Sequence, residues 1–364
     1  MSRIISIGTA VPQHRTDQRA ILDFMHSSYS DAVASRKLNV LFDHSGISSR
    51  YSVLPDFDKS RNQHVFFNGV PTTANVMNRL DEFKKAVLPL SVAAINNAFS
   101  SLNSSAREFG ISHLITVSCT GIYAPGMDAE LVRELGLPND IYHTAINFMG
   151  CNAAFHALKI ADMILQTEKE AKVLVVCTEL CTIHFQPKND HDNLLSNTIF
   201  GDGSAAVVLC SDSDAETKGL KGLRIDGFYG ILLEEGKDLM GWNITPQNFE
   251  MILNARIPEF IGNELGMIIH KAGKKLNIQP GDIQHWAIHP GGKKILDTIK
   301  QQLQLSEEEM SYSYKVLNDF GNMSSPTILF VLNELLQKKN EGAVFTIGFG
   351  PGLSIETALL HHAG

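Results

Sequence analysis

The chain has fewer basic than acidic residues, and it has no long apolar run. Lys and Arg number 31 against 39 Asp and Glu among 364 residues, which gives a formal net charge of −8. Because nucleic acids are bound mainly through clusters of Lys and Arg, this balance and the lack of a basic block argue against a nucleic-acid partner. The longest apolar runs, such as 205–210, fall far short of the ~20 residues that cross a bilayer, so we expect no membrane span.

Cysteine is also scarce, and its count is odd. The five cysteines lie at positions 119, 151, 177, 181 and 210, and no C-x-x-C pair occurs. This pattern does not suit a disulfide framework and indicates a reducing compartment. The N-terminal segment MSRIISIGTAVPQHR lacks the charged, apolar and cleavable regions of a signal peptide, so we expect a cytoplasmic protein.

What is present is the material for a large α/β core. Hydrophobic residues make up 44% and charged residues 19%, which argues against a disordered or fibrous chain. Short β-rich segments alternate with helical patterns, which is typical of an α/β fold. We expect strands at 4–7, 114–117, 172–177, 204–209, 223–228, 284–288, 344–348 and 355–360. We expect helices at 82–100, 153–166, 249–276, 292–303 and 325–338.

The two halves of the sequence are similar in pattern. The strand-then-glycine segment 114–121 recurs at 285–292, and Gly150-Cys151 recurs at the same spacing as Gly321-Asn322. A third pair, at 200–203 and 349–352, precedes a strand in each half. The polar stretch 211–222 reads as a linker. We therefore predict a duplicated α/β unit with halves at 1–212 and 221–364, and a ligand site where their strand ends meet.

Three residues in separate loops suit nucleophilic chemistry. Cys151 opens an amphipathic helix, whose free N–H groups favour a thiolate, although a buried structural cysteine is the alternative. His289 ends a strand before Pro-Gly-Gly and suits a base or a hydrogen-bond donor, or else it is an ordinary turn histidine. Asn322 is either a helix N-cap or an amide donor to a developing oxyanion.

Together these groups admit two kinds of chemistry. A thiol, an imidazole and an amide suit acyl transfer from a thioester followed by carbanion chemistry, but papain-like proteases use the same three residue types. Spacing alone does not separate the two uses. The cysteines and histidines at 177, 181, 184 and 191 have no metal-ligand spacing, so we expect no metal site and no cofactor.

Seven segments then occur in a fixed order along the chain: SCTGIYAPGMDAELVRELGL (118–137), NFMGCNAAFHALKIA (147–161), ELCTIHF (179–185), IFGDGSAAV (199–207), IHPGGKKILD (288–297), GNMSSP (321–326) and GFGPGLSIE (348–356). They resemble the chalcone synthase-like type III polyketide synthases, a branch of the thiolase-fold condensing enzymes. The HPGG and GNMSS segments favour this branch over the ketoacyl-carrier-protein synthase III enzymes. The resemblance implies an αβαβα layered fold built from two duplicated halves.

The resemblance also implies a division of labour among the three candidates. Cys151 would carry the acyl starter as a thioester, and His289 would help form the thiolate as an imidazolium–thiolate pair. His289 and Asn322 would hold the thioester carbonyl of malonyl-CoA while it loses CO2 to form an enolate. Phe200 matches an aromatic gate beside the cysteine.

Further positions match the pocket and the CoA site, with departures from plant members. Thr120 and Cys181 are small pocket positions that would leave room for a long acyl chain. Trp242 falls where plant enzymes have glycine, which would reduce the cavity, and Met251 replaces a second aromatic gate. The other pocket positions implied are Cys119, His184, Ser324 and Gly350. Those implied for CoA are Lys37, Lys293 and Lys294, and two further basic positions of that cluster are replaced by Val40 and His44.

The function that follows is iterative decarboxylative condensation of malonyl-CoA onto an acyl starter by a cytoplasmic homodimer. A fatty-acyl starter, few extensions and a pyrone or resorcinol-type product fit the pocket positions, and phloroglucinol-type products belong to the same class. Two alternatives remain open at this point. One is a single-step condensing enzyme that takes its acyl group from an acyl carrier protein, and the other is a non-catalytic acyl-binding protein of the same fold.

Overall fold

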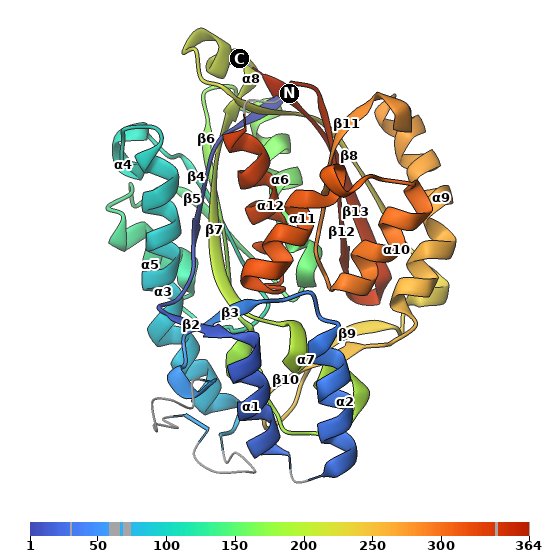
Figure 1. The fold of residues 1–364 in the computed structure, drawn as a ribbon. Coiled ribbons are helices and arrows are strands. Elements are labelled where there is room, and N and C mark those ends of the chain that lie inside the picture. Colours follow the sequence, from blue (N-terminus) through green and yellow to red (C-terminus); the bar gives the residue numbers. More distant parts are fainter. Residues whose placement is uncertain (30, 58–65, 68–73, 339–340, 364) are drawn as a thin grey trace.

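A computed structural model describes residues 1–29, 31–57, 66–67, 74–338 and 341–363, and its centre is a nine-stranded sheet (Figure 1). The strand order is β11-β12-β13-β8-β1-β7-β6-β4-β5. The strands are β1 (Ser2–Ala10), β4 (His113–Ser118), β5 (Tyr142–Asn147), β6 (Lys172–Leu180), β7 (Asp202–Ser211), β8 (Gly222–Leu232), β11 (Ile283–Ile288), β12 (Ala343–Gly350) and β13 (Ser354–Ala363).

The strand order repeats across the middle of this sheet. In one half β1 is antiparallel to β7, β7 is antiparallel to β6, and β6 is parallel to β4. In the other half β8, β13, β12 and β11 follow the same pattern of directions. Within the described part of this sheet, the halves are joined by three residue pairs between β1 and β8. The repeated segments 114–121 and 285–292 include the ends of β4 and β11. The segments 200–203 and 349–352 lead into β7 and β13. The repeated segments therefore occupy corresponding places in the two halves.

Helices form three layers around the two half-sheets. Helix α3 (Val76–Ser100) covers the outer face of the first half, and α9 (Ile257–Leu276) and α10 (Lys293–Leu303) cover that of the second. Between the halves lie α6 (Ala153–Thr167) and α12 (Thr327–Gln337), whose apolar residues share one core with strands of both. The thiolase-like αβαβα arrangement is therefore confirmed: one core lies beneath each outer helix layer, and a central core joins the middle helices to both half-sheets.

The elements that surround the candidate site lie at one end of the strands of the sheet, at the bottom of Figure 1. They are α1 (Gln18–Ser28), α2 (Ala32–Asp43), α7 (His191–Ile199), the hairpin β2 (His14–Asp17)–β3 (Ser49–Ser52) and the hairpin β9 (Met240–Ile244)–β10 (Phe249–Leu253). The expected helix from 249 is wrong at its start, because 249–253 pair with β9 and α9 begins only at Ile257, with Pro258 in its first turn.

The remaining elements are connections. Helix α8 (Asp212–Thr217) lies within the expected linker, where the Ser211 side chain caps it. The others are α4 (Ala106–Phe109), α5 (Met127–Glu134), α11 (Glu307–Phe320), η1 (Pro55–Phe57), η3 (Gly150–Asn152), η4 (Cys181–His184), η5 (Glu234–Gly236), η6 (Pro280–Asp282) and η7 (Pro351–Leu353). Among the described residues, no helix is long and apolar enough to cross a membrane.

Candidate active site

Cys151 lies in a tight turn directly before the central helix α6. The turn needs a glycine at position 150, where φ is +78° and a Cβ atom would lie 2.1 Å from Cδ of Pro351. The Gly150 N–H donates to the sulfur of Cys119 at 3.0 Å, which ties this turn to the end of β4. Cys151 is 7% exposed and lines the cavity described below.

Asn322 reaches Cys151 from the other half of the molecule. Its Nδ2 is 4.0 Å from the Cys151 sulfur and 3.4 Å from the carbonyl oxygen of Gly291. Its Oδ1 accepts the Ser324 N–H at 2.8 Å, so the amide nitrogen is the end directed at the sulfur. Cys151 and Asn322 therefore meet as expected, but the expectation that Asn322 starts or caps a helix is wrong. It lies in the loop before α12, which begins only at Thr327 with Pro326 at its N-cap.

His289 lies after β11, in the loop that Asn322 contacts through Gly291. The imidazole is 1% exposed, and neither ring nitrogen has a hydrogen-bond partner among the described residues. Buried polar atoms are almost always paired. His289 is not in the wall of the cavity described below, and both ring nitrogens are free of bonds to the described residues.

Burial opposes charge on both groups. It raises the pKa of Cys151 to about 11, although the Ser324 hydroxyl and, more weakly, the Asn322 amide act to lower it. Burial also lowers the pKa of His289 to about 3. Each group alone is therefore neutral at pH 7, and a thiolate here requires that the proton pass to a neighbour that balances the charge.

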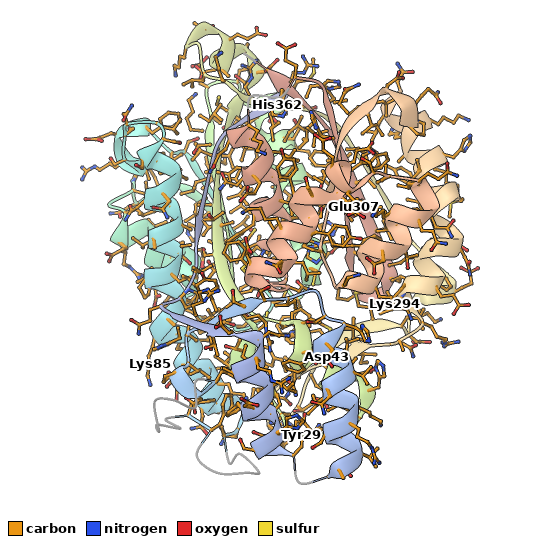
Figure 2. All side chains as sticks on the ribbon, in the orientation of Figure 1. Tyr29, Asp43, Lys85, Lys294, Glu307 and His362 are labelled. Carbon is orange, nitrogen blue, oxygen red and sulfur yellow. The ribbon has the colours of Figure 1, made fainter. Side chains whose placement is uncertain are left out.

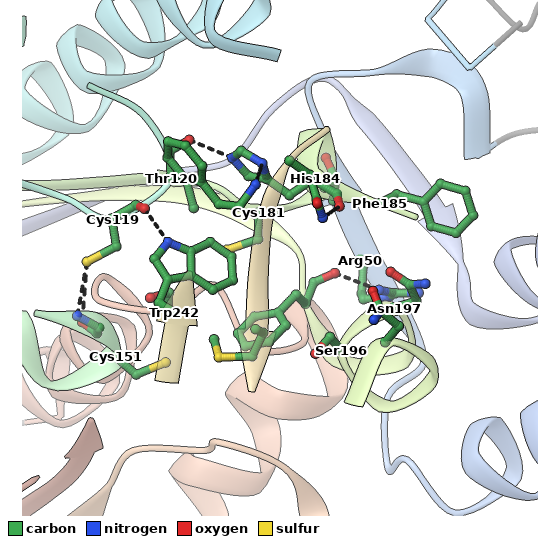
Figure 3. A pocket seen from close by; sticks show the side chains of 18 of the residues that line it. Arg50, Cys119, Thr120, Cys151, Cys181, His184, Phe185, Ser196, Asn197 and Trp242 are labelled. Atoms are coloured by element: carbon green, nitrogen blue, oxygen red, sulfur yellow. Dashed lines mark hydrogen bonds between the residues drawn. The ribbon is translucent and has the colours of Figure 1, made fainter. Parts of the chain in front are cut away.

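A cavity opens beside Cys151, and most of the predicted pocket residues line it (Figure 3). Its volume is about 60 Å³. The predicted residues in its wall are Cys119, Thr120, Cys151, Cys181, His184, Phe200, Trp242, Met251 and Ser324. Gly350 is not in the wall; a Cβ atom there would lie 2.2 Å from Oδ1 of Asn152, so close packing explains this glycine.

The β9–β10 hairpin forms one wall of the cavity. Trp242 and Met251 are direct cross-strand partners, and the indole N–H of Trp242 donates to the Cys119 carbonyl at 2.7 Å. His184 stacks on Phe249 at 4.5 Å, accepts the Phe249 N–H at Nδ1 and donates from Nε2 to the Thr120 carbonyl. Burial lowers the pKa of His184 to about 3. His184 is thus a neutral clamp with both nitrogens occupied.

Glu179, which the sequence reading missed, connects two of the site loops. Its buried carboxylate accepts the Cys119 and Thr120 N–H groups at 2.9 and 3.1 Å and the Thr120 hydroxyl at 2.8 Å. It also accepts the Ser325 hydroxyl, three residues after Asn322, at 2.6 Å. Burial raises its pKa. The available signal was a lone acidic residue in an otherwise apolar strand.

The three predicted CoA lysines lie on the surface and not in the cavity wall. Lys37 is exposed on α2. Lys293 forms an ion pair with Asp297 at 2.6 Å, and its side chain contacts Gly46, just beyond α2. Lys294 is exposed nearby at the start of α10 (Figure 2). Among the described residues, no three His, Cys, Asp or Glu side chains are grouped to hold a metal ion.

Known proteins share this fold and this arrangement of the chain. Residues 1–213 match the N-terminal domain of chalcone and stilbene synthases, and residues 230–363 match the C-terminal domain. The chain is 29% identical over 360 residues to "Alpha-pyrone synthesis polyketide synthase-like Pks18" of Mycobacterium tuberculosis, covering 98% of this chain and 90% of that protein. It is 28% identical over 366 residues to the 3,5-dihydroxyphenylacetyl-CoA synthase of Streptomyces toyocaensis, covering 98% and 89%.

A solved structure agrees with these sequence matches. The crystal structure of PKS-I from the brown alga Ectocarpus siliculosus superposes with a TM-score of 0.90 at 29% identity, covering 100% of this chain and 98% of that one. Fold and site define an acyl-transferring condensing enzyme. The chain belongs to the chalcone and stilbene synthase family, and it is a type III polyketide synthase that condenses malonyl-CoA onto an acyl starter.

Proposed function

We propose that Cys151, His289 and Asn322 carry out this condensation. The observation that carries the proposal is the approach of Asn322 Nδ2 to the Cys151 sulfur, 4.0 Å. The same amide nitrogen lies 3.4 Å from the Gly291 carbonyl, in the loop of His289, whose two ring nitrogens have no partner among the described residues. His289 accepts the thiol proton of Cys151. The thiolate attacks the starter thioester, forms the acyl-sulfur bond and releases CoA, which leaves with the proton from His289.

The second half-reaction uses the same donors on a different substrate. His289 and Asn322 donate to the thioester carbonyl of malonyl-CoA, and the C–C bond to the carboxylate breaks to give CO2 and an enolate. Both hydrogen bonds are stronger to the enolate oxygen than to the thioester carbonyl oxygen, which lowers the barrier. The enolate carbon then attacks the carbonyl carbon of acyl-Cys151; the new C–C bond forms, the acyl C–S bond breaks, and the Cys151 thiolate leaves, which gives a β-ketoacyl-CoA. Phe200, 8% exposed in the cavity wall, presents an apolar surface that disfavours the carboxylate.

The cavity supports a small number of extensions. At about 60 Å³ it leaves little free space, with Trp242 and Met251 paired in one wall. Thr120 and Cys181 are small, and we propose that a longer acyl chain extends beyond the cavity at their positions. Few extensions of an acyl chain, including a fatty one, give an alkylpyrone or alkylresorcinol-type product. The mycobacterial relative, whose name specifies α-pyrone synthesis, supports this choice.

We also propose the partners and the division of the chain. Lys37, Lys293 and Lys294 would bind the phosphates of CoA, which favours CoA over a carrier protein as the acyl donor. The exposed edge strand β5 would pair with a second copy to give a homodimer. The repeated strand order supports halves at 1–212 and 221–364.

The central test measures acyl loading and product formation. Wild-type protein incubated with hexanoyl-CoA should gain one acyl group by intact mass, and with malonyl-CoA it should release pyrone products. Cys151→Ala should lose both, whereas Cys210→Ala, which removes a buried core thiol on β7, should retain both.

The two alternatives give other outcomes in the same assay. Product formation that survives Cys151→Ala would contradict the mechanism. An acyl group that loads but never extends would favour a binding protein. A product with a single malonyl unit, formed only from an acyl carrier protein substrate, would favour the one-step enzyme.

A prediction about chain length follows from Trp242. Replacing the indole by a smaller ring in Trp242→Phe should widen the cavity, and we expect products from longer acyl-CoA starters or with one more malonyl unit. Mass spectrometry of products from C6 to C16 starters measures this. Trp286→Phe is the matched control, because Trp286 is buried in the outer core of the second half-sheet. An unchanged product range in Trp242→Phe would show that the indole does not limit the chain.

A further inference from the structure

Arg50 on β3 is a buried guanidinium that binds to the loop carrying Phe200. The residue is 5% exposed. Its Nη1 donates to the Phe200 carbonyl at 2.6 Å, and its Nε donates to Oε1 of Gln18 at 2.9 Å. It forms no ion pair with a described carboxylate. A buried charge costs several kcal/mol unless its hydrogen bonds are well made, so this geometry is demanding.

The aliphatic part of Arg50 packs against two glycines that flank the site loops. A Cβ atom on Gly321 would lie 2.9 Å from Cγ of Arg50, and one on Gly201 would lie 3.5 Å from its Cβ. At Gly321 the side chain of Arg50 thus leaves little room for a Cβ atom, whereas at Gly201 it is in ordinary van der Waals contact. One loop bears Phe200, and the other bears Asn322.

The same two loops are also bonded to each other. The Gly201 N–H donates to the Asn322 carbonyl at 2.9 Å, and the Asn322 N–H donates to the Ile199 carbonyl at 2.9 Å. The backbone around Phe200 and the backbone around Asn322 are thus held together as one unit. Arg50 contacts both parts of this unit. Any shift of the guanidinium moves the Phe200 carbonyl and, through this unit, the Asn322 amide.

We propose that Arg50 is a positioning residue that sets the Phe200 ring and the Asn322 amide against the malonyl group during decarboxylation. This inference rests on the proposed roles of Phe200 and Asn322. Arg50 is suited to the task because its planar fork donates in two fixed directions, to Phe200 and to Gln18, at once. A lysine ammonium, as a point donor on a flexible stem, does not hold both directions.

The chain offers a matched control in Arg79. It is also buried, and it donates to backbone carbonyls, among them those of Gln247 and Ile183. Gln247 lies in the turn between β9 and β10, and Ile183 lies in η4; Arg79 makes no hydrogen bond to the Phe200 loop or to the Asn322 loop among the described residues. Removing Arg79 therefore removes a comparable buried arginine without touching the unit that Arg50 holds.

The test compares two rates in purified Arg50→Lys, Arg50→Met and Arg79→Met proteins. The first is CO2 release from malonyl-CoA, which depends on Asn322 and Phe200, and the second is alkylation of Cys151 by iodoacetamide. Displacing a positioned group by about 1 Å can cost on the order of a hundredfold in rate. We expect kcat for CO2 release to fall at least tenfold in both Arg50 variants while alkylation changes less than threefold.

The outcomes separate this inference from the proposed function. For Arg79→Met we expect the rates of CO2 release and of Cys151 alkylation either to stay unchanged or to fall by a similar factor. If the rates of CO2 release and of Cys151 alkylation fall by a similar factor in the Arg50 variants, Arg50 is not a positioning residue. The same holds if these variants release CO2 at the wild-type rate. Wild-type protein that releases no CO2 from malonyl-CoA would instead overturn the proposed function. Arg50→Lys keeps a cation at this position, so the test does not depend on the folding of Arg50→Met.

Discussion

At the scale of single residues, the site combines groups that are neutral when considered one at a time. The Cys151 thiol and the His289 imidazole are both buried, and burial shifts their pKa values in opposite directions, to about 11 and about 3. Charging either group alone is costly. In the proposed mechanism the proton passes from the Cys151 sulfur to His289, so that the two charges offset each other.

This coupling predicts the pH dependence of Cys151 alkylation. In His289→Gln the thiol has no proton acceptor beside it, and its raised pKa leaves it protonated below about pH 11. The rate should then rise roughly tenfold per pH unit from 7 to 10. Wild-type protein, in which the pair ionises together, should show a shallower rise and a faster rate at pH 7. Superposable profiles for the two proteins would contradict the pairing.

At the scale of elements, the site depends on loops that are joined by a few buried polar groups. Glu179, at the end of β6, bonds to the loop after β4 and to the loop before α12. The first of these loops contacts the turn of Cys151 through Cys119, and the second carries Asn322. These bonds link the nucleophile and the amide donor even though they come from opposite halves of the chain.

The Glu179 bonds predict how two substitutions differ. Glu179→Leu leaves buried N–H groups unpaired, at about 1–3 kcal/mol each, so we expect a clearly lower urea midpoint. Glu179→Gln keeps an acceptor for Cys119 and Thr120 and supplies an N–H to Ser325. Because burial raises the pKa of Glu179, the folded chain holds that proton more tightly, and wild-type stability falls as pH rises above 4.5.

The side chain introduced in Glu179→Gln does not titrate. The free energy of unfolding of this variant should therefore increase relative to that of wild type from pH 5 to pH 8. Urea unfolding at these two pH values measures the difference. Equal urea midpoints for the Leu and Gln variants would show that the loops do not depend on the carboxylate.

At the scale of the whole molecule, one edge of the large sheet is exposed. Strand β5 pairs with β4 on one side only, and five of its six residues are exposed, with Tyr142 69% exposed. Exposed edge strands favour pairing with another chain, and a second copy of β5 would extend the sheet through a two-fold axis. This geometry supports the proposed homodimer.

A charge on this edge should disrupt that pairing. We expect Ala145→Lys, in the middle of β5, to shift the protein from dimer to monomer in light scattering, because two lysines would meet across the axis. Val40→Lys, at an exposed apolar position on α2, is the control and should leave the mass unchanged. A wild-type protein that is monomeric at micromolar concentration would exclude the homodimer.

The amino-acid sequence was enough to predict the class of fold and to propose the reacting residues. Alternating strands and helices, and the repeated segments that contain glycine, are local patterns, because chain geometry and glycine requirements act over a few residues. For the same reason the prediction was wrong where one local pattern fits two kinds of element. The apolar run from 249 fits a helix, and only its partner strand β9 shows that it begins as a hairpin.

Only the tertiary structure decided which loops meet. Glu179 and Arg50 lie far in sequence from the groups that they hold, so no spacing identifies them. Gly350 was expected in the pocket, yet it packs on Asn152, because a glycine motif does not show which neighbour requires the missing side chain. Local propensity gives elements and candidate groups, whereas burial and hydrogen-bond satisfaction in the packed core determine which of these groups act together.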